Sequence, residues 1–275
     1  MKKSSLLFCS SLLVLSLTAC SNNKIQSTEG VDVGESILST EIPTESTEKV
    51  TEEETKLDTA FTQEKSDKLD SYLSSYTYTE VTQSMENGYE DGTAYTRTSY
   101  DVKADTSSGV ADYSVSQRTD SNTGGAKEGS AHYIRNYKEG ITYEKDDSDN
   151  WIKSEGTVNM ISWGLEDFTS AKDVFDYVLK DYKTPVDTKG YTSGNYEYYT
   201  VEEDANKDMV SGLTYDELGK QTVDYIYYTN DDDEYYPVSV ITKITYKYEG
   251  NDYYIQSTIQ FVTFDNTSLN MPEEN

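Results

Sequence analysis

Apolar and polar residues alternate through most of the chain after residue 57. In the segment 238–248 the residues predicted for one face are Val238, Val240, Ile244, Tyr246 and Tyr248. A second segment follows across Gly250-Asn251-Asp252, and its apolar face consists of Tyr253, Ile255, Ile259 and Phe261. Extended segments of period two, separated by turn residues at intervals of about ten residues, indicate an antiparallel meander.

Earlier segments repeat this pattern. Residues 132–138 and 141–145 flank Glu139-Gly140, and residues 141–145 and 151–155 flank an acidic turn at 146–150. Strands that alternate in this way have one face in water and one face in a core. We therefore predict an α+β fold in which helices cover the apolar side of a large, curved antiparallel sheet.

Helical periodicity occurs in only a few places. One helix is predicted over 59–75, with Asp58 or Thr59 as its N-cap. A second is predicted to start at Ser170, with Asp173 completing a capping box, and to end at Pro185. The apolar face of this second helix is expected to contain Val174, Phe175, Val178, Leu179 and Tyr182. A third, short helix is expected over 209–220.

The first twenty residues have the order of a bacterial export signal. Lys2 and Lys3 precede an apolar stretch of about 12 residues, which is too short to span a membrane. The closing tetrapeptide Leu17-Thr18-Ala19-Cys20 resembles a lipobox, which implies cleavage before Cys20 and attachment of diacylglycerol to its thiol. The alternative is an ordinary signal peptide with a chance cysteine. With Cys9 removed and Cys20 acylated, no thiol would remain for disulfides, zinc or nucleophilic catalysis.

Composition divides the chain into three parts. We predict a signal peptide at 1–19, a lipidated cysteine with a disordered acidic tether at 20–56, and one folded domain at 57–275. Residues 21–56 contain nine acidic residues, three lysines and no aromatic residue, which is typical of a solvated tether. An acidic binding motif for a partner is the alternative reading of this segment.

The net charge of −28 limits the partners of the chain. Loss of Lys2 and Lys3 with the signal peptide would bring it to −30, of which −24 lies in residues 57–275. A polyanion would be repelled by this surface, so nucleic acid is excluded as a partner. A polytopic membrane protein is excluded as well, because no apolar run reaches about 18–20 residues.

All 26 tyrosines lie in the predicted domain. Tyrosine has high strand propensity and packs its ring while its hydroxyl stays in water, so cross-strand packing is one explanation. A cavity lined by rings, for a lipid, a glycan or a peptide, is the other.

Candidate catalytic and metal-binding residues are sparse. The acidic runs 146–149 and 231–234 lack the spacing of a calcium loop and are interpreted as solvated hairpin tips, with weak Ca²⁺ binding as the alternative. His132 is the only histidine and has no partner for a triad or a zinc site. We therefore expect no catalytic residue, no metal site, no cofactor and no enzymatic activity.

The order of these features is similar to that of the LolA/LppX-like bacterial lipoproteins. The resemblance rests on Tyr143-Glu144-Lys145 with Trp151-Ile152-Lys153, on Tyr236-Pro237-Val238, and on the tail with Phe261 to Phe264, Asn266 and Met271-Pro272-Glu273-Glu274. It implies an unclosed barrel with two or three helices on its concave side, which can hold acyl chains. The candidate ligand-binding residues on that concave face are Val238, Val240, Ile244, Tyr246, Ile255, Ile259, Phe261, Val174 and Val178.

Two hypotheses for function follow. The first is a non-catalytic cell-surface lipoprotein that binds a hydrophobic or amphipathic ligand in the half-barrel and is held to the membrane through Cys20. The second is a structural or interaction lipoprotein of the cell envelope, with a protein partner and no small-molecule ligand. Because lysine outnumbers arginine 20 to 3, as in AT-rich genomes, we expect a Gram-positive source and an anchor on the extracytoplasmic face of the cell membrane.

Overall fold

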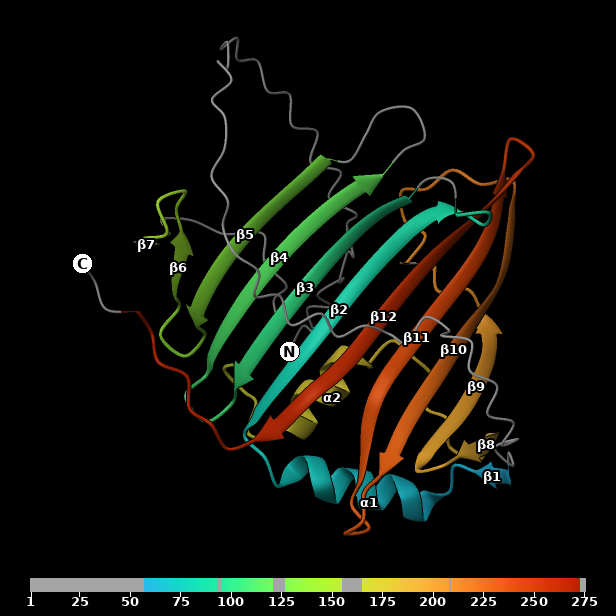
Figure 1. Cartoon of the computed structure of the whole chain (residues 1–275), viewed down its shortest axis with the longest axis horizontal. Coiled ribbons are helices and arrows are strands. Elements are labelled where there is room, and N and C mark those ends of the chain that lie inside the picture. Colours follow the sequence, from blue (N-terminus) through green and yellow to red (C-terminus); the bar gives the residue numbers. More distant parts are fainter. Residues whose placement is uncertain (1–56, 93–94, 121–126, 155–164, 208, 273–275) are drawn as a thin grey trace, which may run out of the picture.

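A single antiparallel sheet forms most of the domain (Figure 1). The computed structural model describes residues 57–92, 95–120, 127–154, 165–207 and 209–272. Its strands are β1 (Leu57–Ala60), β2 (Tyr78–Tyr89), β3 (Tyr95–Asp105), β4 (Val110–Asp120), β5 (Lys127–Asn136), β6 (Ile141–Lys145), β7 (Trp151–Lys153), β8 (Lys189–Ser193), β9 (Tyr196–Asp204), β10 (Glu217–Thr229), β11 (Tyr235–Tyr248) and β12 (Asn251–Asp265). The predicted signal peptide and tether lie outside the described residues.

The strand order is β1-β8-β9-β10-β11-β12-β2-β3-β4-β5-β6-β7, so the 12-stranded sheet ends at β1 and β7 and remains unclosed. Neighbours in sequence pair as hairpins from β2 to β7 and from β8 to β12, whereas β1 pairs with β8 and the last strand, β12, also pairs with β2. This confirms the predicted α+β class with an open, antiparallel half-barrel. The expected hairpin of Tyr143–Lys145 with Trp151–Lys153 is present as β6 and β7.

Two helices are present in the described part of the chain, α1 (Gln63–Ser74) and α2 (Ala171–Val178). Figure 1 shows α2 behind the sheet and α1 across the end where β10 finishes and β11 begins. The Phe175 ring of α2 lies 5.2 Å from the Phe261 ring of β12, so α2 covers the face of the sheet that carries Phe261. We call this the inner face and the opposite one the outer face.

The first helix starts later than its periodicity predicted. Asp58 and Thr59 are not the N-cap, because residues 57–60 form β1 and pair with Lys189–Thr192 of β8. Thr62 caps α1 instead, and its side chain accepts a hydrogen bond from the Lys65 backbone N–H. Pairing with β8 therefore overrides the helical periodicity that continues through these four residues.

The second helix begins where the sequence predicted. Ser170 is the N-cap, and the Asp173 carboxylate accepts from the backbone N–H of Ser170 at 3.0 Å, which completes the capping box. The helix ends at Val178, well before Pro185, and hydrogen-bonded turns carry the chain on through Tyr182.

The third predicted helix, over 209–220, is wrong. Met209 and Val210 lie in a turn and are buried at one end of the inner face, and Glu217 already belongs to β10. Their apolar side chains pack on Ile244 and Ile255, so the apparent helical periodicity reflects a loop that covers the core.

Candidate functional site

The inner face carries most of the candidate residues that the sequence singled out. Val240, Ile259, Phe261 and Val174 belong to the larger apolar cluster, and Val178 packs against it half-buried. A smaller cluster contains Ile244, Tyr246 and Ile255. Apart from Val178, each of these side chains is at most 8% exposed, so together they form the core of the domain.

Val238 is the exception among the candidates. The pairing of β10 with β11 shifts between Ile226, opposite Ser239, and Tyr227, opposite Pro237, so Val238 has no partner across the ladder. It is half-buried and belongs to neither inner-face cluster. A bulge interrupts the alternation here. The prediction assumed a strict period of two and therefore placed Val238 on the same face as Val240, which is wrong.

Tyrosine rings fill much of the space above the inner face. Tyr113, Tyr199, Tyr225, Tyr227 and Tyr235 are each at most 4% exposed. Phe61 lies 5.1 Å from Tyr227 and 5.4 Å from Tyr199, between ring centroids. Burial raises the pKa of the Tyr227 hydroxyl well above its ordinary value, so the phenol stays neutral. Cross-strand packing therefore accounts for these five tyrosines.

Two hydroxyls interrupt the apolar inner face between the two clusters. Thr242 of β11 and Ser257 of β12 are direct cross-strand partners, and each is 1% exposed. Neither side-chain oxygen meets the distance and angle of a hydrogen bond in the described part of the chain, but the Tyr182 hydroxyl lies beside both of them. Burying a hydroxyl without a well-formed hydrogen bond costs about 1–3 kcal/mol. Two such hydroxyls side by side are therefore unusual in the core of a domain.

Tyr182 lies over this pair and packs against both clusters. Burial raises the pKa of its hydroxyl, and the nearby hydroxyls of Ser257 and Thr242 oppose the rise only in part. Tyr182 follows α2 on an irregular connection to β8 and belongs to neither a helix nor a strand. The Tyr225 hydroxyl donates to the Lys183 carbonyl oxygen at 2.5 Å and ties this connection to the sheet.

Sequence reasoning missed Thr242 and Ser257, although a signal for both was present. Thr242 stands between Val240 and Ile244, and Ser257 between Ile255 and Ile259, so each takes an inward position in an otherwise apolar row. A polar residue at an inward position of two neighbouring strands is detectable once their register is known.

A polar network closes the end of the half-barrel beneath α1. The Lys65 ammonium donates to Glu197 Oε1 at 2.8 Å, to Thr59 Oγ1 at 2.9 Å and to the Tyr199 hydroxyl at 2.9 Å. The other oxygen, Glu197 Oε2, accepts from the hydroxyls of Tyr199 at 2.6 Å and Tyr235 at 2.8 Å. Burial lowers the pKa of Lys65, but the hydrogen bonds with Glu197 and Tyr199 outweigh it, and the net pKa is raised.

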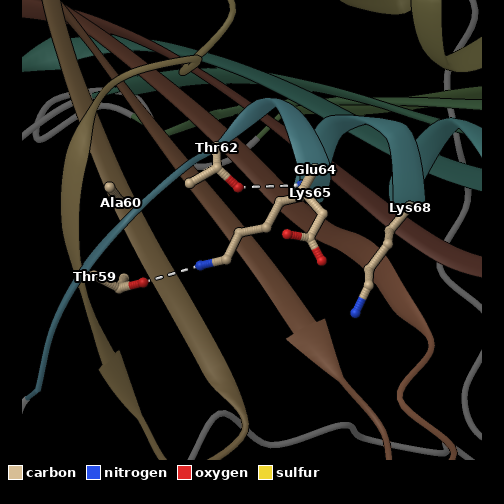
Figure 2. Close-up of a pocket in the computed structure, with 6 residues that line it drawn as sticks. All are labelled: Thr59, Ala60, Thr62, Glu64, Lys65 and Lys68. Carbon is tan, nitrogen blue, oxygen red and sulfur yellow. Dashed lines mark hydrogen bonds between the residues drawn. The ribbon is translucent and has the colours of Figure 1, made fainter.

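A polar depression of about 360 Å³ lies beside this network, between β1 and the first turn of α1. Figure 2 shows Lys65 reaching toward Thr59, with the rest of the lining formed by Ala60, Thr62, Glu64 and Lys68. Both lysine side chains form ion pairs within the domain, Lys65 with Glu197 and Lys68 with Asp233, the latter at 2.9 Å. The depression is therefore part of the contact between α1 and the sheet.

The acidic runs form hydrogen-bonded turns at hairpin tips. Asp146 Oδ1 accepts from the backbone N–H groups of Ser148 and Asn150, and Asn230 Oδ1 accepts from those of Asp232 and Glu234. Among the described residues, no three His, Cys, Asp or Glu side chains converge on a point that could hold a metal ion. In the same part of the chain, no helix has the length and apolarity needed to cross a membrane.

His132 lies on the outer face of β5. Its Nε2 is 2.5 Å from Asp112 Oδ1, and its ring meets Trp151 edge-on with 4.9 Å between centroids. The sequence placed His132 in a strand, and it lies there, packed against an aromatic neighbour.

Asp105 holds the C-terminal segment against the hairpin of β3 and β4. Its buried carboxylate accepts from the backbone and side chain of Ser107, from those of Ser108, and from the Leu269 N–H at 3.0 Å. Burial raises the pKa of Asp105, but these hydrogen bonds outweigh it, so the pKa lies below its ordinary value of 3.8.

The depressed pKa of Asp105 predicts a loss of stability in acid. Because the folded-state pKa is the lower one, the stabilisation is complete above about pH 4 and is lost as the pH falls through the folded value. We expect Asp105→Asn to lower the free energy of unfolding by about 2 kcal/mol at pH 7, and by much less at pH 3. Urea unfolding at the two pH values measures both. Asp101→Asn, on the exposed side of β3, is the control, and an equal loss for Asp105→Asn at both pH values would contradict the assignment.

Comparisons with known proteins assign no family. No protein-family profile matches the chain, and no curated protein matches it. A LolA superfamily protein from Nitrosomonas europaea is similar at 10% identity and a TM-score of 0.25, over 77% of this chain and 96% of that one. A DUF1329 family protein from Desulfovibrio piger is similar at 9% identity and a TM-score of 0.15, over 76% and 94%. At these scores the likenesses carry no argument, and the half-barrel is defined by the strand order of this chain alone.

Proposed function

We propose that this chain is a non-catalytic, extracytoplasmic lipoprotein, anchored through Cys20, that holds an amphipathic small molecule on the inner face of its half-barrel. The observation that carries the proposal is the pair of buried hydroxyls on Thr242 and Ser257, which face each other between two apolar clusters with the Tyr182 hydroxyl beside them. Ligand sites are mostly apolar with a few polar groups that fix orientation, and this pair has that character.

The arrangement of the two clusters supports the same proposal. Apolar side chains flank the hydroxyls on both sides, with Val240 and Ile259 on one side and Ile244 and Ile255 on the other. A ligand with one hydrogen-bonding group and an apolar body would satisfy the hydroxyls and remain in contact with both clusters. Since Tyr182 covers the spot, entry requires displacement of the connection between α2 and β8.

Native mass spectrometry tests this function. We expect the Cys20→Ser chain, secreted and purified without detergent, to carry a co-purifying molecule that organic solvent extracts. N-phenyl-1-naphthylamine, a neutral apolar dye, is expected to compete with it. The double variant Thr242→Val/Ser257→Ala is expected to bind the extracted molecule about ten-fold more weakly, the equivalent of one lost hydrogen bond of about 1.4 kcal/mol.

The control for this variant is Thr258→Val. Thr258 follows Ser257 directly and lies on the outer face, where its hydroxyl accepts from Gln256. We expect Thr258→Val to bind like the parent chain. If no molecule co-purifies with the parent chain and the double variant is simply more stable, the hydroxyls are a structural irregularity and the proposed function is wrong.

A further inference from the structure

A continuous row of tyrosine rings runs over the outer face at the end of the sheet nearest α1. Its members are Tyr196 of β9, Tyr228 of β10, Tyr236 of β11, Tyr72 of α1 and Tyr76 just after α1; we call them the outer tyrosine row. Successive ring centroids are 4.8, 5.4, 5.3 and 5.0 Å apart. Every member is at least partly exposed, and Tyr196 reaches 41%.

Core packing accounts for Tyr72, which packs against the larger inner-face cluster and lies 5.8 Å from the Phe264 ring, but not for the strand tyrosines of the row. Strand alternation turns Tyr227 and Tyr235 into the inner face, where they are 2% and 4% exposed, and it turns Tyr228 and Tyr236 outward. A contiguous aromatic surface that stays partly exposed is typical of a contact site. Aromatic side chains are also enriched in protein–protein interfaces.

An acidic turn adjoins the row. Tyr228 and Tyr236 lie at the two ends of the hairpin whose tip contains Asp231, Asp232, Asp233 and Glu234, all exposed. Burial raises the pKa of Tyr236, and neighbouring tyrosines and the Glu234 carboxylate add to the rise, which places Glu234 close to the rings. Asp233 pairs with Lys68, whereas Asp231 and Asp232 have no ion pair within the described part of the chain.

The charge of the chain excludes most occupants. A second copy would bring another net charge of −24 against this surface, and the predicted tether is itself acidic, with nine acids against three lysines. An anionic lipid surface would be repelled for the same reason. A cationic partner remains, and it would complement both the tyrosine rings of the row and the carboxylates of the turn 231–234.

The rings themselves favour a cationic partner. Elsewhere in the domain, cations of the chain lie over aromatic rings, for example Lys180 at 4.3 Å from the Tyr177 centroid and Arg135 at 4.8 Å from that of Tyr137. None of the described lysines or arginines lies over a ring of the outer tyrosine row. Among the described residues, the ring faces are therefore not occupied by such a contact.

We propose that the outer tyrosine row and the acidic turn 231–234 form a docking surface for an extended, arginine- and lysine-rich segment of another protein. Guanidinium groups stack on the ring faces, and Asp231 and Asp232 pair with the neighbouring cations. The strand tyrosines of this surface and the acidic turn lie on the outer face, opposite the face that carries Thr242 and Ser257. The two proposals can fail separately.

Peptide binding to the Cys20→Ser full-length chain tests the docking surface. Nona-arginine is the probe, and nona-lysine and nona-glutamine are compared with it by isothermal titration at low and high salt. We expect nona-arginine to bind more tightly than nona-lysine, because a guanidinium stacks better on a ring, and nona-glutamine not to bind. Binding should weaken as salt is added.

Matched variants separate a specific surface from a generally acidic one. Tyr228→Thr/Tyr236→Thr, which leaves the charge unchanged, is expected to weaken nona-arginine binding about ten-fold, as the loss of two cation–π contacts requires. Tyr215→Thr removes another exposed tyrosine, at the far end of β10, and should stay within about two-fold of the parent chain. Asp231→Asn/Asp232→Asn should weaken binding several-fold, and Asp147→Asn/Asp149→Asn, at the tip between β6 and β7, should not.

Two results would overturn the proposal. Equal binding by the row variants and their controls would show that nona-arginine recognises net charge alone. Binding of a neutral oligosaccharide such as chitohexaose that depends on Tyr228 and Tyr236, with nona-arginine binding unaffected by them, would assign the row to glycans instead. Near-ultraviolet circular dichroism and the unfolding temperature confirm that each variant is folded before its affinity is compared.

Discussion

Replacement of Cys20 by serine is expected to abolish fatty-acid attachment completely. In the proposed lipoprotein the Cys20 thiol carries the diacylglycerol, and serine has no thiol to accept it. Each buried CH₂ of an acyl chain contributes about 0.8 kcal/mol, so two chains hold a protein stably at a membrane and their loss removes that attachment. Cells grown with an alkyne-labelled palmitate should label the parent chain and leave Cys20→Ser unlabelled.

Cys9→Ser is the matched control for this experiment. Cys9 is the only other cysteine and lies within the predicted signal peptide, so its replacement should leave the labelling intact. Intact mass spectrometry of the labelled protein should place the new N-terminus at Cys20. Equal labelling of Cys20→Ser and the parent chain, or a mature chain that begins elsewhere, would refute the anchor.

The second large effect is expected where α1 closes the end of the half-barrel. We expect Lys65→Met to lower the free energy of unfolding on the order of 2 kcal/mol, because it leaves the Glu197 carboxylate, 13% exposed, without its cation. In a domain of this size the unfolding temperature should fall by about 4 to 8 °C. The hydrogen bonds from Tyr199 and Tyr235 to Glu197 remain, which keeps the loss below that of a fully buried pair.

Lys68→Met is the control on the same helix. Lys68 pairs with Asp233, but the two side chains are 43% and 77% exposed, so the change should cost less than about 1 kcal/mol. The double variant Lys65→Met/Glu197→Gln should lose less than the sum of its single variants, since no charge is left unpaired. Equal effects of the two single lysine variants would show that burial does not strengthen the Lys65 contact.

Local sequence was sufficient where a feature depends on residues near one another. The inward positions of Val240, Ile244, Ile255 and Ile259 follow from an alternation of period two within each strand, and the structure buries all four. The start of α2 follows from Ser170 and Asp173, three residues apart. The hairpin of β11 and β12 follows from the glycine-containing turn between them.

Predictions from local sequence were wrong where pairing with a distant strand determines the structure. Residues 57–60 carry a helical pattern, yet they pair with β8, more than 120 residues later. Val238 shares the alternation of Val240, yet a bulge against β10 removes it from the inner face. In both cases the deciding interaction joins segments that local periodicity does not connect.

The sequence by itself therefore determined the α+β class, the antiparallel meander and the face on which most core residues lie, because these depend on propensity and period within short segments. Only the tertiary structure decided that β12 inserts between β11 and β2, that Lys65 meets Glu197 across 132 residues, and that Thr242 and Ser257 face each other between two apolar clusters. The outer tyrosine row belongs to the same group, since strand register and the position of α1 bring its rings together. These contacts depend on how strands far apart in the chain align, and the hydrophobic pattern of each strand alone leaves that alignment open.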